Sequence, residues 1–365
     1  MTDPLRFSFY GSSLVSAYWN GAATYYRGII KALARLGHEV TFYEPDAYER
    51  QAHRDIDDPA WARVVVYEPT VEAMEQVLQD GAGADVVVKC SGVGVLDAEL
   101  EAGVLAHRRG ASTIVYWDVD APATLERMEA DPGDALRALV PSFDLVLTYG
   151  GGVPVVERFA RLGNPSCVPV YNALDPETHH PAAPDPRFDG LLGLLANRLP
   201  DRERRVEEFF LAAAASLPDE RFVLGGSGWA DKAMPPNVRY VGHVYTRDHN
   251  AFNATPRAVL NVARDSMARN GFSPATRVFE AAGCGACLIS DAWEGIELFL
   301  EPGREVLVAG GGSEVADHLR RLDAPTAEGI GEAARRRVLA EHTYDHRAAQ
   351  LQELLVARTI AQVRR

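Results

Sequence analysis

The chain has 365 residues, of which 47% are hydrophobic and 24% charged, with a formal net charge of -14 and a pI near 5.2. This length suits two domains of about 150–180 residues, the composition is that of a globular rather than a disordered protein, and an acidic chain disfavours nucleic acid or an acidic membrane surface as a partner. With no apolar run of about 18 residues, no signal-peptide pattern and no disulfide framework, we expect a cytoplasmic protein.

Short apolar segments alternate with amphipathic segments in the first half of the chain. We predict a strand at 6–10, a helix at 25–36 closed by Gly37, and a strand at 39–43. Further predicted elements in this half are strands at 85–89, 113–117, 145–148 and 167–170, and helices at 71–79, 98–109 and 153–162.

A stretch rich in Pro, Asp and His, from Asn172 to Pro186, breaks both periodicities and predicts a linker. The alternation then restarts. The elements predicted beyond it are strands at 191–196, 222–225, 238–241, 258–262, 286–290 and 305–308, a helix at 204–215 and a long terminal helix at 344–363.

This doubled alternation predicts an α/β protein of two Rossmann-like domains whose parallel sheets face a central cleft. The first domain would span 1–175, the linker 176–189 and the second domain 190–342. The last segment, 343–365, could pack back towards the first domain. Because ligands of such sheets bind at the carboxyl ends of the strands, the loops after the strands are the candidate sites.

The most informative of these loops leads from the strand at 258–262 into a helix. Ser273 is a good N-cap and Pro274 suits the first helical position, while Gly271 lets a ligand approach the backbone. A helix N-terminus attracts phosphate, and Arg277 on the first turn could add a charge-assisted contact. Glu280, two turns into the helix, could reach a ribose. The residues equally allow a plain capped helix that faces the core.

The run NGFSPATRVFEAAGCGACLISDAWEGIELFLEPGREVLVA resembles the donor-binding core of the CgeB-like branch of group 1 glycosyltransferases. The resemblance extends over 190–355 and is looser over 1–180, where GHEV and VYWDVDAP match best. It implies the GT-B fold, with a nucleotide-sugar donor in the second domain, an acceptor in the first and no metal requirement. It also implies hexosyltransferase activity; most relatives retain the anomeric configuration, and for this chain both a retaining and an inverting course stay open.

The resemblance also implies roles for individual residues. Glu280 matches the second acid of the family's Glu-(seven residues)-Glu motif, which binds the ribose, whereas Phe272 stands in place of the first acid. Phe272 would line the donor diphosphate together with Gly271 and Ser273, and the donor sugar stays unspecified. Arg198 and Arg202 resemble the loop that supplies the cations of the diphosphate clamp, although a solvated surface is the alternative for both.

A second strand end resembles the loop that reads the nucleobase edge in related enzymes: Gly242, His243 and Val244. A plain turn is the alternative, since glycine is common after strands. In the first domain, Asn20 and Gly21 precede the first helix, where the family's first loop approaches the diphosphate and the acceptor.

Asp118 and Asp120 follow a predicted strand of the first domain, so at least one carboxylate should face the cleft as a general base for the acceptor hydroxyl. Either could instead cap the next helix. Asp-x-Asp is also the metal-binding motif of GT-A enzymes, but a metal would duplicate the arginine clamp, so we predict no metal site. Among the other motifs, Cys284 and Cys287 form a CxxC that we assign to packing, and we assign His179 and His180 to a hinge.

Together these features predict transfer of a sugar from a nucleotide diphosphate sugar, the only co-substrate, to an unidentified small-molecule or glycan acceptor. The reaction would need no cofactor and no metal. A sugar-nucleotide epimerase on the same scaffold and a non-catalytic sugar-nucleotide-binding protein are the alternatives. The sequence does not specify the nucleotide, the sugar or the oligomeric state.

Overall fold

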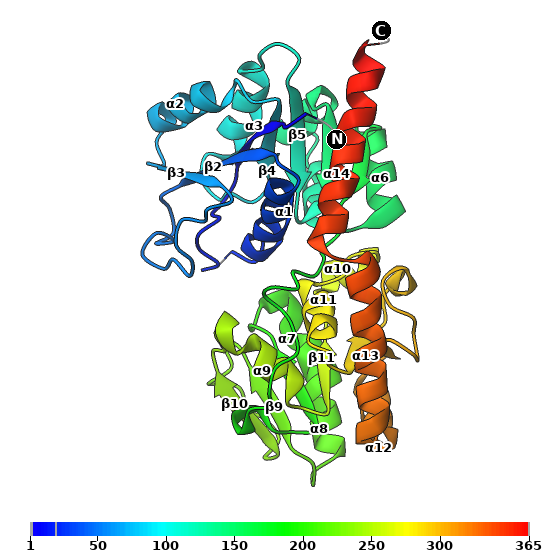
Figure 1. Ribbon diagram of the computed structural model, residues 1–365. Helices are drawn as coiled ribbons and strands as arrows, with labels where there is room; N and C mark the ends of the chain where they lie inside the picture. The colour runs from blue at the N-terminus through cyan, green and yellow to red at the C-terminus, as the bar shows by residue number, and fades with distance from the viewer. Residues whose placement is uncertain (1–2, 19, 364–365) are drawn as a thin grey trace. The chain divides into compact units, whose positions relative to one another are not determined.

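The computed structural model describes residues 3–18 and 20–363, and the side chains of these residues up to Arg358. The chain divides into two compact units (Figure 1). The first contains Met1–Tyr171 together with Tyr344–Arg365, and the second contains Asn172–Thr343. The stretch predicted as a linker, 176–189, therefore belongs to the second unit.

The first unit is built on a seven-stranded parallel sheet in the order β3-β2-β1-β4-β5-β6-β7. Its central strands are buried on both faces, as their apolar sequences require: β4, with the sequence VVVKC, is buried at every position. The strands are β1 Arg6–Tyr10, β2 Glu39–Pro45, β3 Arg63–Tyr67, β4 Val86–Cys90, β5 Thr113–Asp118, β6 Leu145–Thr148 and β7 Cys167–Pro169.

Helices connect these parallel strands, as such a sheet needs. They are α1 Ala23–Arg35, α2 Val71–Gly81, α3 Asp97–Ala106, α4 Ala121–Ala130, α5 Ala135–Leu139 and α6 Gly152–Arg161. The terminal helix α14, Tyr344–Val363, lies alongside α1 in Figure 1. A Cβ atom at Gly28 of α1 would lie 2.2 Å from the Tyr344 ring, so only glycine allows this contact.

The second unit has a six-stranded parallel sheet in the order β10-β9-β8-β11-β12-β13. Its strands are β8 Leu192–Leu195, β9 Phe222–Gly225, β10 Val238–Gly242, β11 Ala258–Asn261, β12 Leu288–Asp291 and β13 Leu307–Ala309. The chain order along the sheet is 3-2-1-4-5-6, which is the doubly wound Rossmann order.

The helices of the second unit bury their apolar faces against this sheet. They are α7 Pro200–Val206, α8 Ala212–Ser216, α9 His249–Ala254, α10 Asp265–Asn270, α11 Thr276–Gly283, α12 Gly312–Arg321 and α13 Ala324–Glu341. A π-helical turn, Glu207–Leu211, joins α7 to α8. Phe210, Leu224, Leu260 and Ile289 are among the buried residues of the core.

The predicted pair of parallel α/β folds is confirmed, but several elements differ from expectation. The strand β3 was not predicted, and α4, which begins at Ala121, was foreseen only in the alternative that Asp118 or Asp120 caps a helix. The helix predicted to begin at Pro274 begins at Thr276, and the short helix α10 precedes it. None of the described helices is long and apolar enough to cross a bilayer.

Candidate functional site

The order of each sheet reverses at one place, between β1 and β4 in the first unit and between β8 and β11 in the second. Ligands of doubly wound sheets bind beside the carboxyl ends of the strands at this reversal. In the second unit, the loop after β8 carries Arg198, and the segment after β11 carries Gly271 to Ser273. Several of the predicted donor-site residues therefore flank the expected position.

Backbone contacts link the loops after β8, β9 and β10. The Asn197 side-chain oxygen accepts from the Ser227 amide at 2.9 Å, and the Gly226 amide donates to the Gly242 carbonyl at 2.8 Å. Gly226 has a φ of +121°, and a Cβ there would lie 2.1 Å from the Ala196 carbonyl oxygen. Glycine is thus required for these loops to approach one another so closely.

Arg198, assigned to the diphosphate clamp, already holds two carboxylates. Its guanidinium lies 2.7 Å from Glu203 and 2.9 Å from Asp231, and a quarter of the side chain is exposed. An incoming phosphate would compete with these partners. Arg202 lies on α7, half-buried.

A third arginine, Arg205 on the same helix as Arg202, was not expected at the site. Arg205 pairs with Asp291 at 2.5 Å, and the Asp291 side chain, at the end of β12, is fully buried. Burial raises the pKa of this carboxyl above its ordinary value, although Arg205 acts against the shift. Arg205 therefore fixes α7 to the carboxyl edge of the sheet.

The segment between α10 and α11 corrects one expectation. Ala275, not Ser273, occupies the N-cap position of α11, and it makes no side-chain capping bond. Pro274 accordingly lies outside the helix, and the Ser273 hydroxyl donates to the Gly271 carbonyl at 2.9 Å. The Ser-Pro pattern predicted the cap wrongly because tertiary contacts bind this segment to another loop.

That other loop follows β12, and the contact with it strains Phe272. The Phe272 amide donates to the Glu294 carbonyl at 2.6 Å, and Phe272 adopts a left-handed φ of 48°. A Cβ at Gly271 would lie 2.8 Å from the Glu294 Cβ, and one at Gly295 would lie 2.3 Å from the Phe272 ring. A left-handed non-glycine residue costs about 1–2 kcal/mol, and such strain concentrates at ligand sites.

Glu280 lies on the second turn of α11 and is buried among cationic and imidazole side chains. Its Oε2 lies 3.5 Å from Nη1 of Arg277, and its Oε1 lies 3.8 Å from Nε2 of His179. His249, at the start of α9, is the third neighbour: one ligand atom each from His179, His249 and Glu280 lie within 4.8 Å of one another. The Arg277 guanidinium therefore contacts Glu280, one turn further along the same helix.

The charges of this cluster set its protonation. Burial raises the pKa of Glu280, but His179, Arg277 and His249 outweigh burial and hold it below its ordinary value. Burial and then the Arg277 charge lower the pKa of His249 to about 4. At neutral pH, Glu280 is therefore a carboxylate and His249 a neutral imidazole.

The loop after β10 contains the predicted nucleobase residues. His243 is exposed and Val244 is buried, while Gly242 has a left-handed φ of 76°. A cavity of about 370 Å³ adjoins this loop; its lining includes His243, Val244, Tyr245 and Arg239. The Nδ1 atom of His243 lies 3.4 Å from the Ser227 hydroxyl at the end of β9.

In the first unit, Asn20 is buried and uses its amide to fold the loop after β1. Its Nδ2 donates to the Ser13 carbonyl at 2.8 Å and to the Ser16 carbonyl at 3.1 Å, and its Oδ1 accepts from the Ser12 hydroxyl. Gly21 is exposed, and a Cβ added to it would have no described atom within 4 Å.

Asp118 and Asp120 differ in their surroundings. Asp118 ends β5 fully buried, and its Oδ1 accepts from the Asp120 amide at 2.9 Å. Burial raises its pKa to about 6. Asp120 is half-buried and occupies the N-cap position of α4 without a side-chain capping bond. A substrate could reach the Asp120 carboxylate more easily than that of Asp118.

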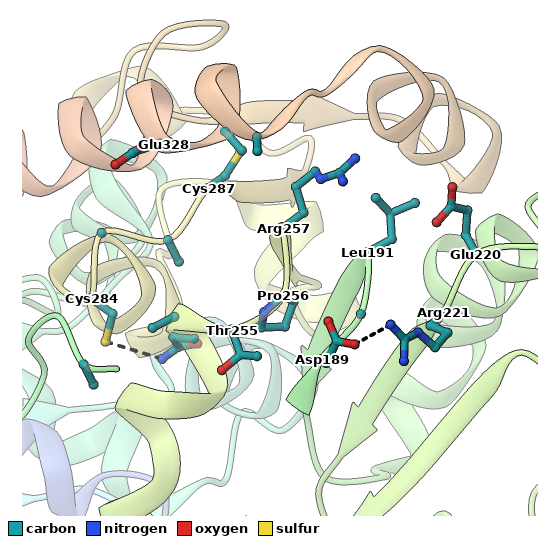
Figure 2. A pocket seen from close by; sticks show the side chains of 18 residues that line it. Asp189, Leu191, Glu220, Arg221, Thr255, Pro256, Arg257, Cys284, Cys287 and Glu328 are labelled. Atoms are coloured by element: carbon teal, nitrogen blue, oxygen red, sulfur yellow. Dashed lines mark hydrogen bonds and ion pairs between the residues drawn. The ribbon is translucent and has the colours of Figure 1, made fainter. Parts of the chain in front are cut away.

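A larger cavity, of about 570 Å³, lies at the opposite edge of the second sheet (Figure 2). Its lining includes Leu191, Arg257 and Cys287, which lie at the amino ends of β8, β11 and β12. Cys284 also lines it, and the two thiols point in different directions in Figure 2. Both are unoxidised, and burial raises the pKa of each to about 12, which makes them poor nucleophiles.

Sequence reasoning missed the two histidines beside Glu280. His179 was assigned to a hinge, but the buried Asn172 amide donates to the Pro274 carbonyl at 3.0 Å and holds this segment beside α11. Leu174 packs against Gly283, where a Cβ would lie 2.3 Å from the leucine. No local pattern reports such contacts between segments about 100 residues apart. The only hint of this position in the sequence was the composition of the run Asp-Pro-Glu-Thr-His-His, which is rich in acidic and histidine residues.

Comparisons with known proteins support the fold. Residues 202–353 match a family model described as "Glycosyl transferase-like". A sucrose-phosphate synthase from Thermosynechococcus elongatus superposes with a TM-score of 0.70 at 14% identity, over 98% of this chain and 100% of that one. Anabaena HepE, solved in complex with UDP and glucose, superposes with a TM-score of 0.67 at 12% identity, over 97% of this chain and 100% of that one.

AviGT4, a glycosyltransferase involved in avilamycin A biosynthesis, gives a TM-score of 0.62 at 18% identity, over 96% of this chain and 97% of that one. No curated protein sequence matches this chain significantly. Residues 202–353 thus match a glycosyltransferase-like family, and the chain as a whole has the GT-B fold of two Rossmann-like domains.

Proposed function

We propose that this protein is a glycosyltransferase that moves a hexosyl unit from a nucleotide diphosphate sugar to a small-molecule or glycan acceptor. We place it in the CgeB-like branch of group 1 glycosyltransferases and in the cytoplasm. The GT-B fold and the match over 202–353 support the glycosyltransferase assignment.

One observation carries the proposal: Glu280 is a buried carboxylate beside the strand ends where a nucleotide should bind. It contacts Arg277 and His179 at 3.5 and 3.8 Å, which is longer than a hydrogen bond. Its lone pairs can therefore accept hydrogen bonds from a ligand. The two hydroxyls of a ribose match a carboxylate of this kind, because hydrogen bonds to a charged acceptor contribute about 1.5–3 kcal/mol each.

The diphosphate would lie between the loop after β8 and the segment before α11. There, Arg198 and Arg202 would supply positive charge, and the backbone of Gly271, Phe272 and Ser273 would approach the phosphates. The first amides of α11 have no acceptor within the helix. Arginines and helix amides together can stabilise the leaving diphosphate, so we propose that the transfer needs no metal.

The other parts of the substrates are assigned by position in each unit. The nucleobase would contact the loop of Gly242, His243 and Val244, beside the cavity of about 370 Å³. In the first unit, Asn20 and Gly21 would border the diphosphate and the acceptor. Of the two candidate bases, we favour Asp120 over the fully buried Asp118.

The test is calorimetric titration of the full chain with nucleoside diphosphates and their glucose conjugates, in the presence of EDTA. UDP comes first because HepE was solved with UDP and glucose. We expect micromolar binding of at least one nucleotide, and we expect Glu280→Gln to weaken it. Glycosyl transfer or slow donor hydrolysis should follow and should be lost in Asp120→Asn. The absence of binding by any nucleotide would refute the proposal, whereas binding without transfer or hydrolysis would favour the non-catalytic alternative.

A further inference from the structure

Three metal-ligand side chains converge in the second unit from distant parts of the chain. His179 comes from the segment before β8, His249 from the first residue of α9 and Glu280 from α11. One nitrogen or oxygen atom from each lies within 4.8 Å of the other two. We infer that these three side chains bind a divalent transition-metal ion, with zinc as the preferred ion.

The distances suit a shared ion better than a direct contact. His179 Nε2 and Glu280 Oε1 are 3.8 Å apart, too far for a hydrogen bond. Two ligands of one tetrahedral zinc ion, each at about 2.0–2.1 Å from it, lie about 3.3–3.5 Å apart. Since the widest separation is within 4.8 Å, side-chain movements of about 1 Å would bring the three groups onto an ion.

Each histidine also has a buried ring nitrogen left for a ligand. Among the described residues, Nε2 of His179 and Nδ1 of His249 have no hydrogen-bond partner, although both are buried. His249 Nε2 lies 3.3 Å from the Val244 carbonyl. A proton on Nε2 would serve this contact and leave the Nδ1 lone pair available. Metal-binding histidines are commonly oriented by such a contact to a carbonyl group.

The arginine beside the cluster does not prevent metal binding. Arg277 approaches Oε2 of Glu280, whereas His179 approaches Oε1. A metal on Oε1 would leave Oε2 paired with the arginine, as ligating carboxylates often are.

The chemistry of the three groups favours particular ions. Two imidazoles and one carboxylate suit zinc, cobalt or nickel, whereas magnesium and calcium prefer all-oxygen sites. His249 is half-buried as a residue, while its Nδ1 atom is buried. A water molecule could complete a four-coordinate zinc site.

The proposed metal site and the ribose site proposed above both use Glu280. A competition between metal and nucleotide follows, and this consequence rests on the proposed function. The metal and the nucleotide would then compete for one carboxylate. Zinc should inhibit the transferase by weakening donor binding, and EDTA should restore it. Metal binding itself depends only on the three side chains.

The experiment titrates cobalt(II) chloride into the metal-free full chain and records visible absorption, because tetrahedral cobalt with nitrogen and oxygen ligands absorbs strongly near 500–600 nm. We expect one cobalt ion per chain, displaced by zinc. His179→Ala and His249→Ala should each lower the affinity at least tenfold. The matched control is His180→Ala, because His180 is exposed and directly follows His179.

Circular dichroism and thermal unfolding in EDTA would show that each variant is folded. His179→Gln provides a second, milder variant. The inference is overturned if the wild-type chain gives no tetrahedral cobalt spectrum, or if folded His179 and His249 variants bind cobalt as tightly as the wild type. His179 and Glu280 would then be neighbouring side chains that share no metal ion. Failure of every nucleoside diphosphate to bind in EDTA would refute the proposed function but leave a positive cobalt result in force.

Discussion

Two buried glutamates, Glu44 in the first unit and Glu280 in the second, show how differently the two sheets use a carboxylate. Glu44, on β2, is fully buried, and its oxygens accept from the Ser13 hydroxyl at 2.9 Å, the Leu14 amide at 2.6 Å and the Gln51 amide at 2.5 Å. Glu280 is also buried, but its two neighbours Arg277 and His179 lie at 3.5 and 3.8 Å.

The difference separates a carboxylate that stabilises the fold from one that can bind a ligand. The hydrogen bonds to Glu44 hold the loop after β1 against β2, and no ligand could replace them without unfolding that loop. Glu280 keeps its charge through electrostatic contacts while its lone pairs stay available. We therefore expect changes at Glu44 to affect stability and changes at Glu280 to affect binding.

The largest expected effect is that of Glu44→Gln. A glutamine would present an NH₂ group where a carboxylate oxygen accepts a hydrogen bond, and it would remove the charge that strengthens the others. We expect a loss of about 3 kcal/mol in the free energy of unfolding, and a melting temperature lower by roughly 6–12 °C. Denaturant unfolding would measure it. An unchanged midpoint would mean that Glu44 is no structural anchor.

Asp118→Asn should change the free energy of unfolding by nearly as much as Glu44→Gln, but in the stabilising direction. The pKa of Asp118 is raised to about 6 in the folded protein, so its protonated form is favoured there. The associated stability is present below the unfolded pKa of about 3.9 and is lost as the pH rises through about 6. At pH 7, we expect the asparagine variant to be more stable by about 2–3 kcal/mol.

The check is the difference between the wild-type and Asp118→Asn unfolding free energies from pH 4 to pH 8. Taking the difference removes the contribution of Glu101, whose pKa burial raises to about 7. The variant's advantage should shrink as the pH falls below 6. Loss of glycosyl transfer in this variant would contradict the preference for Asp120 as the base.

A smaller free-energy change, confined to binding, is expected from Glu280→Gln. The variant can no longer accept two charge-assisted hydrogen bonds, so nucleotide affinity should fall about tenfold or more. Stability should change by about 1 kcal/mol or less, because no short hydrogen bond to the carboxylate is lost. Calorimetry measures the nucleotide affinity, and thermal unfolding measures the stability. A large loss of stability with unchanged affinity would make Glu280 equivalent to Glu44.

The smallest effect should come from Arg198→Ala. Its ion pairs with Glu203 and Asp231 are at the surface, where such pairs contribute little. We expect stability within about 0.5 kcal/mol of the wild type and a several-fold weaker affinity for a nucleoside diphosphate. Comparing a nucleoside with its diphosphate localises the loss, because only diphosphate binding should change. If the affinities for the nucleoside and for its diphosphate fall equally, the diphosphate clamp lies elsewhere.

Much of the fold could be predicted because its signals are local. The strand Arg6–Tyr10 has aromatic residues at three of five positions and is followed by Gly11, and Phe222–Gly225 is an apolar run between Arg221 and Gly226. The helix Tyr344–Val363 has no internal Gly or Pro. The missed strand Arg63–Tyr67 lies at the edge of its sheet, and Tyr67 alone among its five residues is buried. Its run of three valines was a signal that could have identified it.

The candidate site was less predictable because it depends on contacts between distant segments. The sequence indicated Glu280 and the loop before α11, but the Ser273 cap was wrong because the loop binds Glu294 instead. The position of His179 beside Glu280 depends on Asn172 and Leu174 packing on α11. Such pairings have no local periodicity and become visible only in three dimensions.

The division of the chain has a consequence for how the protein forms during synthesis. The chain passes between the units twice, after Tyr171 and after Thr343, so the second unit is one continuous segment inserted into the first. The Tyr344 ring that packs on Gly28 is translated more than 300 residues later. On the ribosome, the second unit is therefore complete before the first, which must wait for its last helix.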